Sequence, residues 1–392
     1  MVPMDADNKT YPDSFLDAVA AAVDDGLRLD DLRSTLAAQT DRLVGGGLFR
    51  GISRLILTGS GDSLFAAQCV RPALQRWTGL IVEVRSALEL ARYEAPLLDP
   101  DRDLVIGVSN SGSSSRTRET VLLSRDRGVR TLGVTGSVNG PLASLSQEVL
   151  HRPVVPLEGL PAHWGRVFLN MAEYLAALHA LYELGLALGV DRGVLTSEAA
   201  ADLRREATEI TARLAADAAA VEPIMAGWAD EVAGLDALWA IGGGPSRGTA
   251  NYVAAKFHEQ VPLAGIAQDL EEWAHLEYFL TLEIGAASVV LIHAPPGAAF
   301  DRAAELTTGI AQAGGRALVV TETGATGFDA TAALVGLSQA PELLTPLSYH
   351  LPGQLLALHV ARSRGVPHIP LRRTDDYWLI RGGHVRNTMD GL

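Results

Sequence analysis

Two stretches of the chain repeat the same order of apolar and polar positions. In SRLILTGSGDSLFAAQCVRPALQRW and in ALWAIGGGPSRGTANYVAAKFHE, an apolar run is followed by a glycine-rich turn and then by a helical pattern. A second run and helix follow each stretch. The runs 104–108 and 289–292 are apolar without alternation, which is typical of parallel strands covered on both faces. The pattern predicts a duplicated α/β fold, in which each tandem domain is a parallel-sheet three-layer α/β/α sandwich and helices join the two.

The same pattern predicts the domain boundaries. We expect a helical N-terminal region (1–45), a first α/β domain (46–158), a helical connector (159–232), a second α/β domain (233–345) and an irregular C-terminal tail (346–392). The most apolar part of the connector, FLNMAEYLAALHALYELGLALGV, contains Glu173, His179 and Glu183. Ionisable side chains are costly at the centre of a bilayer, so we expect a buried helix there and no membrane span.

Composition narrows the class of protein. The chain has 392 residues, 48% of them hydrophobic and 20% charged, which indicates large buried cores. Its formal net charge of -14 disfavours nucleic acid and acidic membranes as partners. The single cysteine, Cys69, excludes an internal disulfide, and the first residues lack the pattern of a signal peptide. We therefore expect a cytoplasmic protein.

A hydroxyl-rich loop follows the apolar run that ends at Val108. In this serine loop (residues 109–114), Ser109, Ser111 and Ser114 can each donate a hydroxyl where a helix begins, and free N–H groups at a helix start favour anions. The alternative is a polar turn whose serines only cap the helix. Because the P-loop motif is absent and GSGDSLFAA lacks the third glycine of G-x-G-x-x-G, we expect a small phosphorylated substrate and no nucleotide. We expect no other cofactor, and no metal, since a carboxylate-bridged di-iron site needs a four-helix bundle and two more glutamates.

The segments GSGDS and SNSGSS, each placed after a strand, resemble the sugar isomerase (SIS) domain family. The duplication resembles the tandem arrangement in the isomerase half of glucosamine-6-phosphate synthase and in fructosamine-6-phosphate deglycases. The resemblance implies that the phosphate of the substrate is bound by Ser63, Ser109, Asn110, Ser111 and Ser114. Asp62 stands where the family often has Thr, and Ser113 where it usually has Glu. The second half has no serine at the matching loop, HAPPGAAFDRA, so we expect phosphate in the first half only.

A lysine and a glutamate share one face of a predicted helix in the second half. Lys256, one of only two lysines, precedes Glu259 by three positions, and His275 follows in an E-x-x-H stretch. The spacing resembles that of the isomerase domains, which implies that Glu259 moves a proton between sugar C1 and C2, that His275 assists ring opening and that Lys256 lies near Glu259. Alternatively, the pair is an exposed ion pair and His275 is buried beside Trp273.

The resemblance also separates the reactions. The chain has no room for a glutaminase domain, and Asp390 in VRNTMDGL stands where the synthases carry a Schiff-base lysine. A substrate that brings its own amine needs no such lysine, so we predict a deglycase that cleaves an amine conjugate of a ketose 6-phosphate. The alternatives are an aldose–ketose isomerase, an amino-sugar-phosphate deaminase and a sugar-phosphate sensor without catalysis.

Two further expectations concern substrate and subunit contacts. His163, Arg166 and Asp390 match the substrate rim of the family loosely. The family completes each active site with a histidine from a neighbouring subunit, so we expect a homodimer with a shared site. His275 could act in its own subunit or in the neighbouring one.

Overall fold

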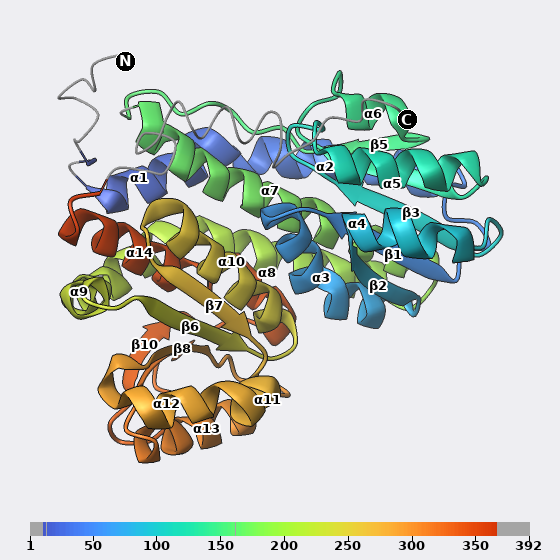
Figure 1. Ribbon diagram of the computed structural model, residues 1–392. Coiled ribbons are helices and arrows are strands. Elements are labelled where there is room, and N and C mark those ends of the chain that lie inside the picture. The colour runs from blue at the N-terminus through green and yellow to red at the C-terminus, as the bar shows by residue number, and fades with distance from the viewer. Residues whose placement is uncertain (1–10, 13, 161, 367–392) are drawn as a thin grey trace, which may run out of the picture. The chain divides into compact units, whose positions relative to one another are not determined.

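The computed structural model describes residues 11–12, 14–160 and 162–366, drawn in colour in Figure 1. The described residues form two compact units, each with one sheet. The first-sheet unit contains Ala22–Leu157 and Phe168–Glu209, and the second-sheet unit contains the described residues before Ala22, Glu158–Val167 and residues 210–366.

The sheet of the first-sheet unit has five parallel strands in the order β2-β1-β3-β4-β5. The strands are β1 (Arg54–Gly59), β2 (Ile81–Ser86), β3 (Asp103–Val108), β4 (Arg130–Thr135) and β5 (Glu148–His151). All residues of β3 are buried, and so are those of β1 from Leu55 on. A strand buried along its whole length must be covered on both faces, which explains why these runs are apolar without alternation.

Helices cover this first sheet (Figure 1). They are α2 (Leu29–Gly45), α3 (Asp62–Thr78), α4 (Ala87–Glu89), η3 (Leu90–Glu94), η4 (Ala95–Leu97), α5 (Ser115–Asp126), α6 (Pro141–Leu145) and most of α7 (Ala162–Asp191) and α8 (Ser197–Ala212). α3 packs against β1 and β2, and α5 packs against β3 and β4. This is the α/β sandwich that the sequence predicts.

The second-sheet unit repeats this topology. Its strands are β6 (Ala237–Gly242), β7 (Ala264–Gln268), β8 (Val289–His293), β9 (Arg316–Glu322) and β10 (Ala333–Leu337). They are parallel and lie in the order β10-β9-β8-β6-β7, which is the order of the first sheet read from the other edge. The duplicated fold expected from the sequence is therefore confirmed at the level of strand order.

Helices pack against the sheet of the second-sheet unit, and one of them contains Lys256 and Glu259. They are α1 (Phe15–Ala21), α9 (Leu214–Ala233), α10 (Pro245–Gln260), α11 (Leu270–Glu272), η5 (Trp273–Glu277), α12 (Tyr278–Ile284), η6 (Gly285–Ala287), α13 (Phe300–Gln312), η7 (Glu342–Leu347) and α14 (Leu351–Ser363). α10 packs against β6 and β7 on one side and contacts α14. Figure 1 shows α14 in red beside the yellow α10.

Two expectations about helices need correction. The N-terminal helical region is interrupted, because η2 (Ala22–Leu27) follows α1 and Arg28 adopts a left-handed conformation (φ 45°) before α2. The irregular tail expected from residue 346 instead contains α14, whose residues from Leu351 to Ala361 are buried. The apolar pattern LLALHVA is helical, and its burial between α9 and α10 stabilises it.

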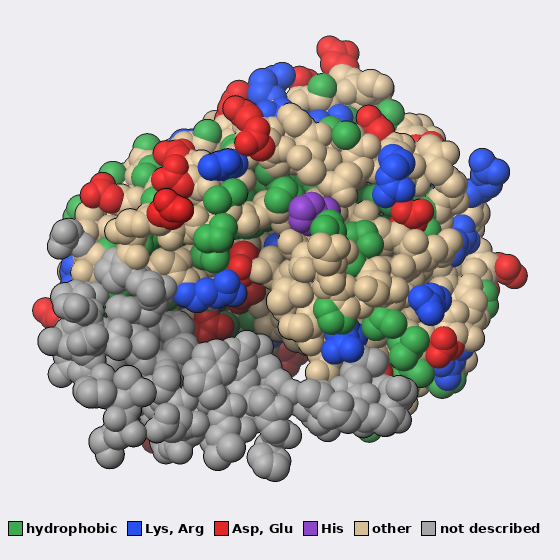
Figure 2. Space-filling view, turned by 90° about the horizontal axis from the view of Figure 1, so that it is seen from above, with side chains coloured by type: hydrophobic (Ala, Val, Ile, Leu, Met, Phe, Trp, Pro, Cys, Tyr) green, Lys and Arg blue, Asp and Glu red, His purple; other side chains and the backbone are tan. Residues whose placement is uncertain are grey.

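The long apolar stretch of the connector forms part of α7. Within the part of the chain that the structure describes, no helix combines the length and apolar character needed to cross a bilayer. On the face drawn in Figure 2, arginine side chains lie singly among acidic ones and form no continuous basic patch.

Candidate functional site

The predicted phosphate residues lie at the carboxyl ends of β1 and β3. β1 lies between β2 and β3, so the chain leaves β1 toward one edge of the sheet and β3 toward the other. Ligands of parallel α/β sheets bind at such a point of divergence. A Cβ on Gly59 would lie 3.0 Å from the carbonyl oxygen of Val108, so only glycine allows the two loops this close approach.

The serine loop follows β3 and leads into α5. Gly112 has φ 67°, a conformation that favours glycine, and its N–H bonds the carbonyl of Ser109 at 3.2 Å. Ser109 is buried, and the Ser111 and Ser113 hydroxyl oxygens lie 2.7 Å apart. Ser114 is the N-cap residue of α5, yet its side chain makes no capping hydrogen bond. The loop therefore keeps hydroxyls that capping does not occupy.

The buried Arg152 holds the side chain of Asn110 in place. The Asn110 Oδ1 accepts a hydrogen bond from Nη1 of Arg152 at 3.1 Å, and the same nitrogen donates to the carbonyl of Glu173 in α7 at 2.8 Å. Arg152 directly follows β5 and is 1% exposed, and burial lowers its pKa to about 10. Asn110 thus braces the loop through its side-chain oxygen. Arg152 was missed in the sequence, where only its place after the β5 strand could have indicated it.

Ser63 and Asp62 begin α3, directly after the loop that ends β1. Both are partly buried, and Gly61 precedes them with φ 58°. The structure therefore brings Ser63, Ser109, Asn110, Ser111 and Ser114 to the carboxyl edge of one sheet, on two neighbouring loops.

The corresponding loops of the second sheet contain an internal carboxylate. Oε1 of Glu342 accepts a hydrogen bond from the N–H of Ala298 at 3.1 Å, just after β8. A Cβ on Gly297 would lie 2.2 Å from the carboxyl carbon of Glu342, and one on Gly244, after β6, would lie 4.0 Å from its Oε1. The Glu342 carboxylate lies at the loop after β8, and its negative charge disfavours an anion there, which gives a physical reason to expect phosphate in the first half only.

Lys256 and Glu259 lie on one face of α10. The Nζ of Lys256 donates to Oε2 of Glu259 at 2.8 Å. The Lys256 side chain is 2% exposed and that of Glu259 is 44% exposed. Lys256 also lies over the ring of Tyr252, 4.5 Å from its centroid. The alternative of an exposed ion pair is wrong for Lys256, because its side chain is buried. The Glu259 carboxylate that it binds does reach solvent.

Two buried histidines lie near one another in the second-sheet unit, and one of them, His350, also lies near Lys256. The N-cap residue of α14, His350, is fully buried with its ring 5.4 Å from that of Tyr252. His293 ends β8, and its Nδ1 lies 3.2 Å from the carbonyl oxygen of Ile241. Burial lowers the pKa of His350 to about 3 and that of His293 to about 4. Both are therefore neutral at physiological pH. Nothing in the local sequence separates them from ordinary core residues.

His275 lies on the surface. It belongs to η5, its side chain is 68% exposed, and its Nε2 lies 3.3 Å from Oε1 of Glu271. The alternative of a buried histidine beside Trp273 is wrong, since only the tryptophan is buried. Exposed apolar side chains follow His275 along η5 and α12, and they are Leu276, Phe279, Leu280, Leu282 and Ile284.

The predicted rim is covered only in part. Arg166 lies exposed on α7. The side chain of His163 and the whole of Asp390 lie outside the described residues.

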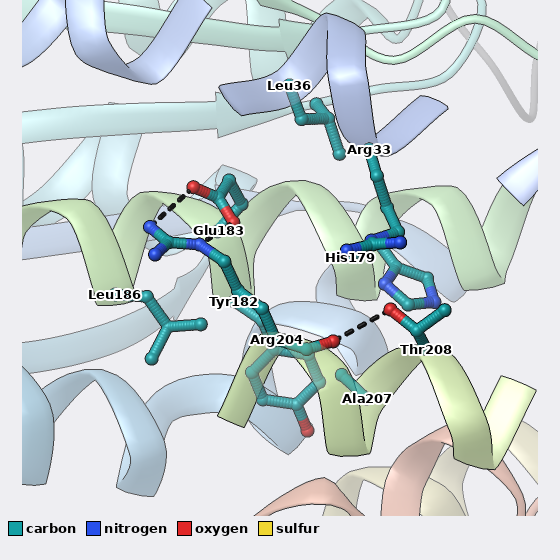
Figure 3. Close-up of a pocket in the computed structure, with 9 residues that line it drawn as sticks. All are labelled: Arg33, Leu36, His179, Tyr182, Glu183, Leu186, Arg204, Ala207 and Thr208. Carbon is teal, nitrogen blue, oxygen red and sulfur yellow. Dashed lines mark hydrogen bonds and ion pairs between the residues drawn. The ribbon is translucent and has the colours of Figure 1, made fainter. Parts of the chain in front are cut away.

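A pocket between α2, α7 and α8 contains none of the predicted site residues. It is lined by Arg33, Leu36, His179, Tyr182, Glu183, Leu186, Arg204, Ala207 and Thr208 (Figure 3). The Glu183 carboxylate accepts two hydrogen bonds from Arg204, each 2.8 Å long. Burial, aided by Arg33, lowers the pKa of His179 to about 4. The main charges are paired within the pocket wall, so this pocket is not the candidate site.

The chain is similar in sequence to proteins of a known family. Residues 48–184 match the family model described as SIS domain. The glutamine–fructose-6-phosphate aminotransferase (isomerizing) of Bradyrhizobium diazoefficiens is 27% identical over 319 residues, which cover 81% of this chain and 50% of that protein. The chain thus spans about half the length of the curated relatives it matches.

Solved structures share the two-sheet fold. The C-terminal domain of glucosamine-fructose-6-phosphate aminotransferase from Francisella tularensis superposes with a TM-score of 0.73 at 16% identity, over 92% of this chain and 99% of that one. Tagatose-6-phosphate ketose/aldose isomerase from Escherichia coli gives a TM-score of 0.65 at 17% identity, over 89% and 92% of the two chains. At these identities the matches establish the fold, which is that of two SIS domains.

Proposed function

We propose that this chain, which matches the SIS domain family over residues 48–184, is a phosphosugar-processing enzyme with Glu259 as its base. The observation that carries the proposal is the half-buried pair on α10: a buried ammonium 2.8 Å from a carboxylate that is 44% exposed. A positive neighbour favours the charged form of a carboxylate, and that form removes protons. The exposed part of Glu259 leaves room for a substrate carbon to approach.

The chemistry requires one base that acts at two neighbouring carbons. In an amine conjugate of fructose 6-phosphate, Glu259 removes a proton from C1, the electron pair forms the C1–C2 double bond, and the C2 carbonyl oxygen takes a proton from water to give an enaminol. The protonated Glu259 then returns its proton to C2 while the amine nitrogen releases its own proton to water, which leaves a C1=N imine and a hydroxyl on C2. Water adds to C1, the C–N bond breaks, and an aldose 6-phosphate and a free amine are released. No oxidant or metal takes part in this sequence.

Phosphate recognition belongs to the first-sheet unit in this proposal. The hydroxyls of Ser111 and Ser114, and the N–H groups at the start of α5, offer donors to the phosphate. The carboxylate of Glu342 excludes a second phosphate from the matching place in the second sheet. One substrate per chain is therefore expected.

The nature of the leaving amine distinguishes a deglycase from a synthase. A synthase that makes its imine with an enzyme amine needs a lysine that can reach the ketose. Lys256 is buried and bound to Glu259, and Asp390 stands at the position of the family's tail lysine. A substrate that already carries its amine fits this residue set, which favours the deglycase over the isomerase and the deaminase.

A homodimer would supply His275 to the neighbouring site. His275 is exposed and its contact is with Glu271, while the apolar side chains after it on η5 and α12 remain uncovered within this chain. Exposed apolar stripes of this kind mark protein interfaces. We propose that this stripe packs on a second copy and carries His275 to it.

The proposal is tested by turnover of a defined substrate panel. Purified chain is incubated with fructose 6-phosphate, glucosamine 6-phosphate and amino-acid conjugates of fructose 6-phosphate, and products are followed by phosphorus NMR and amine release. We expect amine release from at least one conjugate. Aldose formation from fructose 6-phosphate alone would favour the isomerase, and release of ammonia from glucosamine 6-phosphate the deaminase. Binding of these sugars without turnover would leave only the sensor.

A further inference from the structure

The burial of the Lys256 ammonium requires compensating contacts. An ammonium side chain that is 2% exposed has lost nearly all of its hydration, and burying a charge is unfavourable unless it is paired. The Glu259 carboxylate supplies one acceptor at 2.8 Å, and this carboxylate is itself 44% exposed. An aromatic ring on the same helix supplies a further favourable contact.

Tyr252 lies one helical turn before Lys256 on α10. Its ring is fully buried, and Nζ lies 4.5 Å from the ring centroid, within the range of a cation–π interaction. The ring is fixed at two points. Its hydroxyl donates to Oε1 of Gln354 in α14 at 3.1 Å, and the ring of His350 meets it edge to face.

Among the described residues, three groups lie close to the Lys256 ammonium. They are Glu259 and Tyr252 on its own helix and His350 at the start of α14, and His350 in turn lies near His293 at the end of β8. Both histidines are fully buried and neutral near pH 7, because burial keeps their pKa values low. The two histidines therefore add no second positive charge near the ammonium that lies over the Tyr252 ring.

We propose that Tyr252 is a positioning residue, which holds the Lys256 ammonium by its ring so that the ammonium in turn holds Glu259 ionised and oriented. This inference rests on the proposed function for its catalytic consequence, but not for its geometry. The hydroxyl bond to Gln354 keeps the ring in place, and the ring itself carries the interaction. Phenylalanine at this position should therefore preserve the effect, and leucine should abolish it.

The lysine count gives a direct probe of the geometry. Chain made with carbon-13 lysine has only two lysine side chains, Lys9 and Lys256, and a Lys9→Arg variant assigns them in an NMR spectrum. We expect the Lys256 side-chain signals to show an upfield ring-current shift in the wild type and in Tyr252→Phe. In Tyr252→Leu they should move to the position of an ordinary lysine. A Lys256 signal that is the same in Tyr252→Leu as in the wild type would overturn the proposal.

Kinetics on a substrate that the wild type converts separate positioning from simple loss of stability. We expect Tyr252→Leu to lower kcat about three- to thirty-fold, the size of a buried cation–π interaction, with little change in KM. The acid limb of its pH–rate profile should move to higher pH, and Tyr252→Phe should restore both. An unchanged acid limb in a folded Tyr252→Leu would contradict the proposal, since lost stability lowers the amount of active enzyme without moving the profile.

Two arms keep the outcomes distinct. If no phosphosugar is turned over, the proposed function fails while the lysine spectrum still decides whether Tyr252 holds the ammonium. If Tyr252→Leu does not fold, Tyr252→Met replaces it. Gln354→Met is a second variant, which keeps the Tyr252 ring but removes the hydrogen bond that fixes it. We expect Gln354→Met to reduce the ring-current shift partly and Tyr252→Met to remove it.

Discussion

The three serines of the serine loop differ in what occupies their hydroxyls. Ser109 is buried beneath the loop, Ser111 shares a hydrogen bond with Ser113, and Ser114 starts α5 without capping it. A capping serine stabilises its helix, whereas a serine that only binds a ligand contributes little to the stability of the ligand-free protein. The two roles can be separated by measuring stability and affinity in one variant.

Ser114→Ala should leave stability nearly unchanged and weaken sugar-phosphate binding. A hydrogen bond to a charged group contributes about 1.5–3 kcal/mol, so we expect affinity to fall by about ten- to a hundredfold. Calorimetry of binding and urea unfolding measure the two effects. Ser34→Ala, on α2, is the matched control, because its hydroxyl bonds only the carbonyl of Asp30 within its own helix. A loss of about 1 kcal/mol in stability with unchanged affinity would make Ser114 a simple cap.

At the scale of elements, local patterns predicted what lies within one element. The apolar runs give β3 and β8, and the K-x-x-E spacing places Lys256 and Glu259 on one face of α10. The surroundings of that face were not predictable, because Gln354 comes from α14, about a hundred positions further along the chain. Tertiary contacts of this separation leave no periodic signal in the sequence.

Other elements show where local patterns mislead. The N-terminal helical pattern is continuous in the sequence, yet Arg28 turns left-handed and divides it. A left-handed arginine is rare, so propensity gave no reason to expect a break there. The anchor of the serine loop, Arg152, was equally hidden, since an arginine is usually a surface residue and here is 1% exposed.

The element formed by η5 and α12 has a testable role in assembly. If its apolar stripe carries His275 into a second copy, each site combines Glu259 of one chain with His275 of the other. Mixing inactive Glu259→Gln and His275→Ala proteins should then restore about a quarter of the wild-type activity, since a random hybrid has one intact site. Activity after mixing, with subunit exchange shown by mass spectrometry, checks this. Proven exchange without recovery would mean that each chain uses its own histidine.

At the scale of the whole molecule, two sheets of one topology have diverged in their loops. The first sheet ends in serines and the second in a loop that accommodates Glu342. The second-sheet unit instead has buried polar groups near Lys256, including His350, and His293 lies near His350. Duplication thus supplies two equivalent edges, and divergence gives them different chemistry.

Stability should fall as the pH drops below about 6.5. Burial lowers the pKa of His350 to about 3 and that of His293 to about 4, so the folded chain keeps both neutral while the unfolded chain protonates them near pH 6.5. Between these values the unfolded state binds more protons. Each histidine then removes about 1.4 kcal/mol of stability per pH unit as the pH falls through this window.

A single variant isolates this contribution. His350→Gln should lose about 2 kcal/mol less stability than the wild type between pH 7 and pH 5, whatever its stability at pH 7. Urea unfolding at the two pH values measures the difference. His258→Gln changes an exposed histidine of α10 and controls for the loss of a histidine as such. An equal pH dependence in His350→Gln and the wild type would show that His350 is protonated in the folded chain.

The central claim is that the Glu259 carboxylate is the base, and the turnover of Glu259→Gln tests it most directly. Glutamine keeps the shape and a hydrogen bond to Lys256 but removes the base, so turnover should fall by about 10²–10⁴ while substrate affinity changes little. The measurement is kcat and KM on a phosphosugar that the wild type converts. A Glu259→Gln protein that keeps about a third or more of wild-type turnover would contradict this account.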